Sequence, residues 1–400
     1  MLKSTKSRTL LLVVVGLLFS ALMYFFNKSP EVTFNEQGGT SYVKYEKAEV
    51  VRVLSESLEK DETVSGLYRG TQDLEVKILS GEHKGEIHEV KNYLSTLFNV
   101  HGKEGLKIIA VVDTAGPNTY QVSVYSYYRA PLLGGMIFIL LAALCTIGGK
   151  KGLKSAVGLV FTFACLIYLF IPMLYRGYSP IVASVVIVAL TTCVTLLLLD
   201  GWSSKSLSAI LGTMLGVVIA GIISSTAGIL AHVTGFNTNE SESLIVIASE
   251  TGMQVKGLLF AGILIASLGA IMDVGISIAS SVHEVYEANP TLSKRELFIS
   301  GINVGRDMMG TMVNTLILAF TGASLTSLML IYAYNVPFNQ LINMDFVAIE
   351  VIQGVSGSIG VILTVPIVAY ISSRIMPSFK KEINVEASKT ILKQIQDEPL

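Results

Sequence analysis

Residues 272–314 read MDVGISIASSVHEVYEANPTLSKRELFISGINVGRDMMGTMVN and join two strongly apolar segments, 254–272 and 308–334. The joining stretch carries charges of both signs at Asp273, Glu284, Arg295, Arg306 and Asp307. A charge at or inside a membrane boundary is costly, so it usually has a partner or a function. The stretch therefore predicts a helical hairpin in a membrane protein, and it is the first place to search for function.

The composition supports a membrane protein with many spans. Of the 400 residues, 51% are hydrophobic and only 15% are charged, whereas soluble domains carry about 25% charged residues. The formal net charge is −1, which argues against a general nucleic-acid-binding protein. Three cysteines lie in apolar runs and fit no metal motif, so we interpret them as buried hydrophobic residues: Cys145, Cys165 and Cys193.

Eight apolar segments are each long enough to cross a membrane as a helix, which takes roughly 20 residues. They are 9–26, 131–149, 153–174, 179–200, 206–232, 254–282, 297–334 and 344–373. The first ends in the bulky run 23–26 and has no small-residue cleavage pattern, so we predict an uncleaved signal-anchor helix. The other seven form a predicted membrane domain, 131–375, which makes about eight transmembrane helices in all.

Basic residues alternate between the predicted loops as the positive-inside rule describes. They follow the second, fourth, sixth and eighth spans, at Lys150, Lys151, Lys154, Lys205, Lys294, Arg295, Arg374, Lys380 and Lys381. The loops on the other side are poor in basic residues, with Arg176 as the main exception. The pattern predicts a plasma-membrane protein with residues 1–8 and the tail 376–400 in the cytoplasm and residues 27–130 outside it.

Residues 27–130 differ in kind from the rest of the chain. They are polar and contain alternating runs at 42–54, 74–80, 106–112 and 120–128. Period-two alternation rich in valine, isoleucine and tyrosine is typical of half-buried strands. We predict a small extracytoplasmic β-rich, barrel-like domain of five or six strands, with a hairpin turn at SGEHKG, 80–85. We interpret its three loosely spaced histidines as separate surface residues: His83, His88 and His101.

Small residues and prolines mark features of the predicted spans. Glycines recur in the fifth and eighth spans, at Gly212, Gly216, Gly221, Gly354, Gly357 and Gly360. This spacing clears one helix face and favours close packing, whereas Pro172 and Pro366 predict kinks. The acidic loop 233–253 contains a short apolar piece, 244–248, which fits a solvated loop, an interfacial or re-entrant helix, or a cation-collecting vestibule.

The charged hairpin presents two polar stripes if both of its arms are helical, because one helix face recurs at three- and four-residue steps. The first arm carries Asp273, Ser277 and Glu284, and the second carries Asn303, Arg306, Asp307 and Asn314. Between the arms, Asn289-Pro290 is a turn signal. Ser293 and Glu296 have capping-box spacing at the start of the second arm.

Folding the arms antiparallel about Asn289-Pro290 places Asp273 opposite Arg306. The same register places Glu284 opposite Arg295. Left unpaired at mid-membrane, the three charges at 273, 306 and 307 would cost on the order of 8–10 kcal/mol. They are therefore either at the cytoplasmic interface, with 274–306 as an inner cap, or paired inside the bundle along a polar path. Glu350, early in the last span, is a candidate for the outer end of such a path.

The same region carries a family resemblance. GLLFAGILIASLGAIMDVGISIASSVHEV, then NP, then SGINVGRDMMGTMVNTLILAFTGASL resemble the YibE/F-like family of bacterial membrane proteins. The resemblance rests on Asp273, Ser277, Glu284, Asn289, Pro290, Gly301, Gly305, Arg306, Asp307, Thr311, Asn314 and Thr315. It implies a multi-pass membrane protein without an assigned activity, so the residue roles rest on physical arguments.

Two functional hypotheses follow. The first is a small-solute or ion transporter or permease with a polar path formed by Asp273, Ser277, Glu284, Asn303, Arg306, Asp307, Asn314 and Glu350. The alternative is a membrane-anchored assembly or envelope-interaction protein that acts through its outer β domain. Seven further spans exceed what an anchor needs, which favours the transporter.

Enzyme signatures are missing from the sequence. It has no HExxH, GxSxG or CxxC motif and no phosphate-binding loop. We therefore predict no enzyme activity, no catalytic residue, and no cofactor or metal. The predicted partners are the lipid bilayer and the small solute or ion, while the sequence identifies no protein partner.

Overall fold

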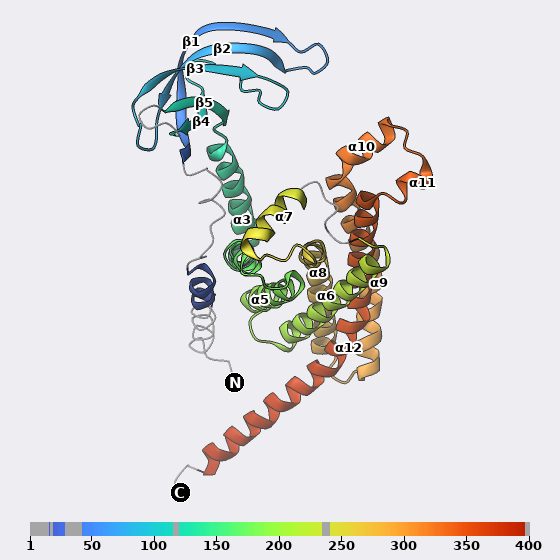
Figure 1. Cartoon of the computed structure of the whole chain (residues 1–400). Helices are drawn as coiled ribbons and strands as arrows, with labels where there is room; N and C mark the ends of the chain where they lie inside the picture. Colours follow the sequence, from blue (N-terminus) through green and yellow to red (C-terminus); the bar gives the residue numbers. More distant parts are fainter. Residues whose placement is uncertain (1–15, 17–18, 29–41, 115–119, 234–240, 397–400) are drawn as a thin grey trace. The chain divides into compact units, whose positions relative to one another are not determined.

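The computed structural model describes residue 16 and residues 19–28, 42–114, 120–233 and 241–396. The chain divides into two compact units. The first comprises Thr33–Ala143, and the second comprises Met1–Val32 together with Leu144–Leu400. The described part of the first unit is a β-sheet followed by the start of a helix, and that of the second is helical (Figure 1). The predicted division into a helical body and a separate β domain is confirmed.

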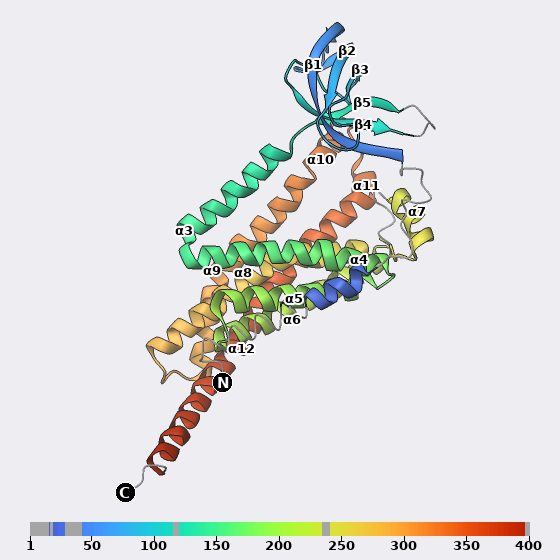
Figure 2. The same cartoon turned by 90° about the vertical axis from the view of Figure 1, so that its left-hand side faces the viewer.

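The β domain is an antiparallel sheet that curls into a half-barrel (Figure 2). Its strands are β1 Val43–Lys60, β2 Tyr68–Ile78, β3 Ile87–Leu94, β4 Lys107–Asp113 and β5 Gln121–Tyr127. Their order is β3-β2-β1-β4-β5, so the edges β3 and β5 do not hydrogen-bond to each other as a ladder. Every second residue of β2 from Gln72 to Ile78 is buried, which confirms the period-two prediction.

The β1–β2 turn holds an ion pair that links stability to pH. Asp61 Oδ2 lies 2.6 Å from Nε of Arg69, and Oδ1 accepts hydrogen bonds from the backbone N–H groups of Thr63 and Val64. The hydrogen bond from Arg69, followed by the two backbone hydrogen bonds, lowers the pKa of Asp61. A lowered folded-state pKa contributes stability that is present above the unfolded value, about 3.9, and is lost as pH falls.

We therefore expect Asp61→Asn to lower the unfolding temperature of the β domain at pH 7 and to have a smaller effect at pH 3. Thermal unfolding of the purified protein at both pH values measures this difference. Glu62→Gln is the matched control, because Glu62 is an exposed neighbouring carboxylate. An Asp61→Asn effect of equal size at both pH values would contradict the charge-based explanation.

From Ala130 onward the described chain is mainly helical. Its elements are α3 Ala130–Cys165, a π-helical turn Leu166–Phe170, α4 Ile171–Tyr175, α5 Pro180–Asp200, α6 Ser204–Leu230, α7 Ser241–Thr251, α8 Leu258–Ala288, α9 Lys294–Ala323, α10 Leu325–Ala333, α11 Phe338–Leu341 and α12 Asp345–Gln396. α12 runs on into the predicted tail as one helix. α7 covers the apolar piece of the acidic loop, whose residues 234–240 lie outside the described residues.

Five stretches of the described chain are long and apolar enough to cross a membrane: Ala130–Tyr175, Pro180–Asp200, Ser204–Leu230, Leu258–Ala288 and Asp345–Ser378. α9 and α10 qualify as a sixth if they form one span, bent by 62°. These helices indicate a membrane-embedded protein. Half of the first predicted span, 9–26, lies outside the described residues, so the count of about eight stays a prediction.

A break at Gly149 divides α3 between the predicted segments 131–149 and 153–174. Gly149 has φ 52°, a left-handed value that glycine adopts without the penalty of a side chain. A Cβ on Gly152 would lie 1.8 Å from the backbone oxygen of Leu144. The chain can therefore change direction here only because both positions are glycine. Pro172 follows the π-helical turn, as expected for a residue that disturbs helical hydrogen bonding.

The helix at residues 19–27 packs against α3 and the π-helical turn that follows it. The rings of Phe19 and Phe161 lie 4.9 Å apart, and Asn27 Nδ2 donates to the Tyr168 carbonyl at 2.8 Å. Arg176 donates to the carbonyl of Lys28 at 2.8 Å. The one prominent exception to the predicted charge pattern, Arg176, thus has a structural role in holding the end of this helix.

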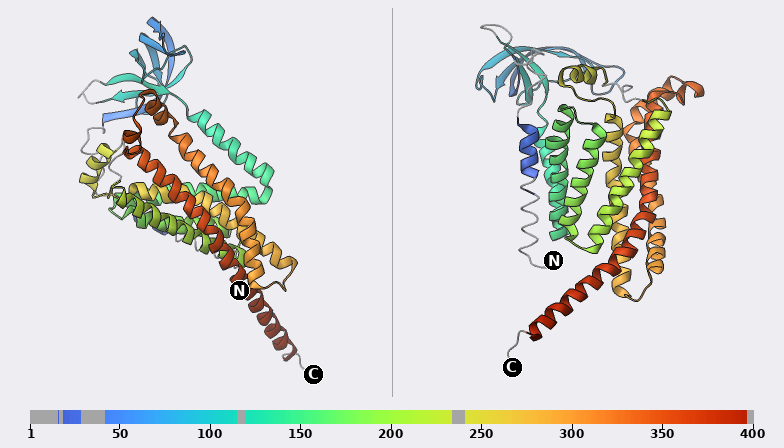
Figure 3. Two further views of the ribbon diagram at one scale, coloured as in Figure 1. Left: turned by 90° about the vertical axis from the view of Figure 1, so that its right-hand side faces the viewer. Right: turned by 60° about the horizontal axis from the view of Figure 1, so that its bottom comes forward.

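Helices α6, α8, α9 and α12 pack side by side (Figure 3). Glycines lie at their crossings. A Cβ on Gly360 of α12 would lie 2.8 Å from Ala220 Cβ and 3.3 Å from the Gly216 carbonyl oxygen, both on α6. One on Gly212 would lie 2.1 Å from Val368 Cγ2. Close packing is confirmed at these positions, whereas Gly354 has open space around it.

Candidate functional site

α8 and α9 form the predicted hairpin, and its second arm begins with the predicted cap. The backbone N–H of Ser293 donates to Glu296 Oε2 at 2.7 Å, and that of Glu296 donates to Ser293 Oγ at 3.3 Å. These reciprocal bonds satisfy two groups that a helix start otherwise leaves unpaired. The capping box is therefore confirmed.

The first predicted stripe lies along α8. Asp273 is midway between Leu258 and Ala288, about 22 Å from either end at the helical rise of 1.5 Å per residue. The side chains of Asp273 and Glu284 are exposed on the surface of the chain, and Ser277 is half-buried. No described residue forms an ion pair or hydrogen bond with the Asp273 carboxylate. The acid therefore faces outward from the bundle.

The second predicted stripe lies along α9 and is wholly exposed: Asn303, Arg306, Asp307, Gly310 and Asn314. Thr311 is exposed beside them, and we call these six residues the α9 polar face. The opposite side of α9 is buried through Leu297, Gly301, Gly305 and Leu316. Among the described residues, the side chains of Arg306 and Asp307 have no partner. The charges of α9 thus point away from the rest of the chain rather than into a shared interior.

The predicted register between the two arms is wrong by about one helical turn. A Cβ on Gly305 would lie 3.2 Å from Ile278 Cδ1, and one on Gly301 would lie 2.9 Å from Val282 Cγ2. The prediction placed Ile278 opposite Gly301 instead. In the described residues neither predicted ion pair forms, because Asp273 is level with Gly310 rather than with Arg306.

The turn explains the shift. The prediction assumed a pivot at Asn289-Pro290, but α8 continues to Ala288 and α9 begins only at Lys294. The centre of the connection is therefore closer to Thr291. Close packing of Gly301 and Gly305 against α8 then stabilises the shifted register of the two helices. The predicted pairs Asp273–Arg306 and Glu284–Arg295 are separated by this displacement.

Glu350 lies well apart from the other candidates. α12 runs parallel to α8, with Gly357 beside Ser267 and Gly360 beside Ile271. Glu350 is therefore about level with Phe260, roughly 20 Å along the axis from Asp273. Its side chain is half-buried. The candidates thus form a series spread along the helix axes, not one compact site.

Some buried polar atoms were missed by sequence reasoning. Thr213 Oγ1, Ser267 Oγ and His283 Nδ1 are buried without a hydrogen-bond partner. Thr213 lies where α6 meets Gly275 of α8. Single hydroxyls in apolar helices carry no sequence signal of burial, because such residues also satisfy themselves by bonding to their own helix.

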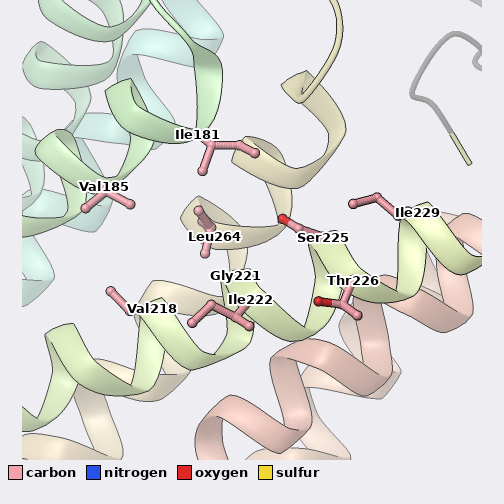
Figure 4. Close-up of a pocket in the computed structure, with 9 residues that line it drawn as sticks. All are labelled: Ile181, Val185, Val218, Gly221, Ile222, Ser225, Thr226, Ile229 and Leu264. Carbon is pink, nitrogen blue, oxygen red and sulfur yellow. The ribbon is translucent and has the colours of Figure 1, made fainter.

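A pocket of about 320 Å³ lies between α5, α6 and α8 (Figure 4). Its walls are mainly apolar, with Ile181 and Val185 from α5, Ile222 and Ile229 from α6, and Leu264 from α8. Two hydroxyl groups from α6 also line it, those of Ser225 and Thr226. None of the predicted path residues lines this pocket, so it is not the polar path.

Two of the three histidines in the β domain lie together rather than apart. The His83 ring stacks on Tyr120, with centroids 3.9 Å apart, and His88 Nε2 lies 2.8 Å from the Tyr120 hydroxyl. Both imidazoles also contact Glu86, at 3.4 and 3.3 Å. Because His88 is on β3 and Tyr120 immediately precedes β5, the cluster connects the two sheet edges. Its role in the fold is to join these edges through side chains.

A comparison with models of protein families finds a match for the helical part of the chain. No curated protein and no solved structure matches the chain. The family model described as "YibE/F-like protein" matches residues 136–378. That match contains α8, α9 and all of the predicted path residues. Because it spans more than half of the 400 residues, this chain belongs to the YibE/F-like protein family.

Proposed function

We propose that the protein moves a small polar solute or ion across the membrane along the polar stripes of α8 and α9. The observation that carries this proposal is the exposure of Asp273 at the middle of α8, which is apolar enough to span a membrane, and of Arg306 and Asp307 near the middle of α9, which qualifies as a span together with α10. Three unpaired charges inside a membrane carry a large free-energy cost. A polar path of water and solute beside these helices would hydrate them.

The proposed orientation follows the distribution of basic residues. About eight helices would cross the plasma membrane, with both termini in the cytoplasm and residues 27–130 outside. Lys150, Lys151 and Lys205 support this orientation, since cytoplasmic loops are enriched in lysine and arginine. The axial series from Glu350 through Asp273 to Glu284 would then run from the outer to the inner side.

Flux measurements in proteoliposomes test the proposal. Purified protein is reconstituted and assayed against a panel of small ions, amino acids and sugars, with protein-free liposomes as the baseline. We expect flux of at least one solute above that baseline, and its loss in Asp273→Asn. Folded wild-type protein without flux for any solute would favour the alternative function.

The alternative is an assembly or envelope-interaction role for the β domain. The observation that favours it is an apolar tip after β3, where Leu97 is 88% and Phe98 is 57% exposed. Exposed apolar clusters often mark interaction sites. Leu97→Ser with Phe98→Ser would abolish a partner interaction while leaving flux intact, which separates the two functions.

A further inference from the structure

The α9 polar face needs a neighbour that this chain does not supply. Arg306 and Asp307 lie near the middle of a 30-residue helix, on the side opposite the buried glycines. A lipid neighbour would leave both charges without polar contacts, which membrane proteins avoid. The face is bounded at its two ends by exposed apolar residues, Ile299 and Ile317. This arrangement is typical of a helix–helix interface with a polar centre.

We propose that the α9 polar face packs against the same face of a second copy of this chain. This inference goes beyond the proposed function and does not depend on it, because the pairing needs no solute. It covers the α9 polar face, so in the paired protein the proposed path would be lined by Asp273, Ser277 and Glu284 of α8. Two copies inserted in the same direction are related by a two-fold axis along the membrane normal. Their α9 helices therefore run parallel, and each residue lies level with its own counterpart.

The arrangement of charges on α9 is complementary to itself under that symmetry. Asn303, Gly310 and Asn314 lie within about 40° of one another around the helix, and they form the centre line of the face. Arg306 and Asp307 are successive residues, about 100° apart, so they flank this line on opposite sides. In a parallel two-fold pair, one flank of a helix meets the opposite flank of its neighbour. Arg306 therefore lies beside the partner's Asp307, and the same pair forms twice.

The centre line supports this arrangement. Gly310 has no neighbouring atom within 4 Å of a Cβ built on it, so its face is open to a second backbone. Small residues allow membrane helices to approach closely, and asparagine side chains can hydrogen-bond across the contact. An asparagine at the centre of a helix pair also favours one register over others. Gly310, Asn303 and Asn314 thus provide close approach and registration, and the flanking charges provide the pairing.

A pair of charge-reversal variants tests the proposal. A chain with Arg306→Asp has two acids on its face, and a chain with Asp307→Arg has two arginines. Two copies of the same variant would repel each other, because like charges meet on both flanks. A mixed pair, with one copy of each variant, would attract, because an acid meets an arginine on both flanks. We expect differently tagged chains to be captured together about tenfold more when the two variants are coexpressed than when either is paired with itself.

Recovery of the mixed pair also shows that both variant chains fold. The double variant Arg306→Asp with Asp307→Arg is expected to pair with itself again, because the two charges have exchanged places. If mixed pairs form no better than same-variant pairs, or if the double variant fails to self-associate while remaining folded, the proposed pairing is wrong.

Cysteine cross-linking provides a second test with the natural charges in place. In a chain with its three cysteines replaced by alanine, we expect Asn303→Cys and Asn314→Cys to form disulfide-linked dimers in oxidised membranes. Ile222→Cys on α6 is the control, since this side chain is 61% exposed on another helix. A disulfide needs Cα atoms within about 7 Å, so equal cross-linking at Asn303 and Ile222 would overturn the proposal.

Discussion

Asp273→Leu is expected to make α8 insert more readily and, at the same time, to abolish flux. A carboxylate at the centre of a membrane helix costs about 2.5–3.5 kcal/mol on insertion scales. Asp273 lies midway along α8, exposed and without a partner among the described residues. Removing it should therefore lower the insertion free energy by about this amount. Gains in stability at the expense of function are typical of residues retained for activity.

A glycosylation-based insertion assay on α8 measures the first effect, and proteoliposome flux measures the second. Ala266→Leu is the matched control, because Ala266 is exposed on the same side of α8 and carries no charge. It should change neither quantity by a comparable amount. Unchanged insertion of Asp273→Leu would mean that the carboxylate lies at the membrane surface. Unchanged flux would remove Asp273 from the path.

Gly360→Ala is expected to lower the free energy of unfolding of the helical unit by about 1–3 kcal/mol, the usual cost of overpacking. The new Cβ would lie 2.8 Å from Ala220 Cβ and 3.3 Å from the Gly216 carbonyl oxygen. Ile271 Cδ1 on α8, at 3.0 Å, can rotate aside, but the Ala220 methyl group is attached directly to Cα and the Gly216 oxygen belongs to the backbone, so neither of these two can. Relief requires α6 and α12 to separate along their whole contact.

Gly354→Ala is the control on the same helix. Its Cβ would meet nothing within 4 Å, so the substitution should be neutral or should stabilise α12 by up to about 1 kcal/mol through helix propensity. Thermal unfolding of both variants in detergent measures the difference. Equal unfolding temperatures for the two variants would show that the crossing of α6 and α12 is looser than these contacts require.

Much of the fold could be predicted from local patterns. Period-two alternation identified four of the strands, and Ser293 with Glu296 located the start of α9. Glycine spacing indicated the faces on which α6 and α12 meet. Each of these features depends on a few neighbouring residues, whose spacing determines local geometry without knowledge of the rest of the chain.

The details of the candidate site could not be predicted in this way. The α8–α9 register depends on how Gly301 and Gly305 pack against α8 and on where the turn is centred. A displacement of one turn separates Asp273 from Arg306, and no local pattern reports it. The contact between His88 and Tyr120 likewise depends on the curl of the sheet, which brings distant residues together.

Thiol labelling tests most directly, and without knowledge of the solute, whether water and solute reach the polar stripe of α8 at mid-membrane. In the cysteine-free chain, Ser277→Cys is treated in intact membranes with a charged, membrane-impermeant reagent. Ile222→Cys on the apolar surface of α6 is the control. We expect labelling of Ser277→Cys but not of Ile222→Cys. Protection of both from the reagent would contradict a polar path along α8.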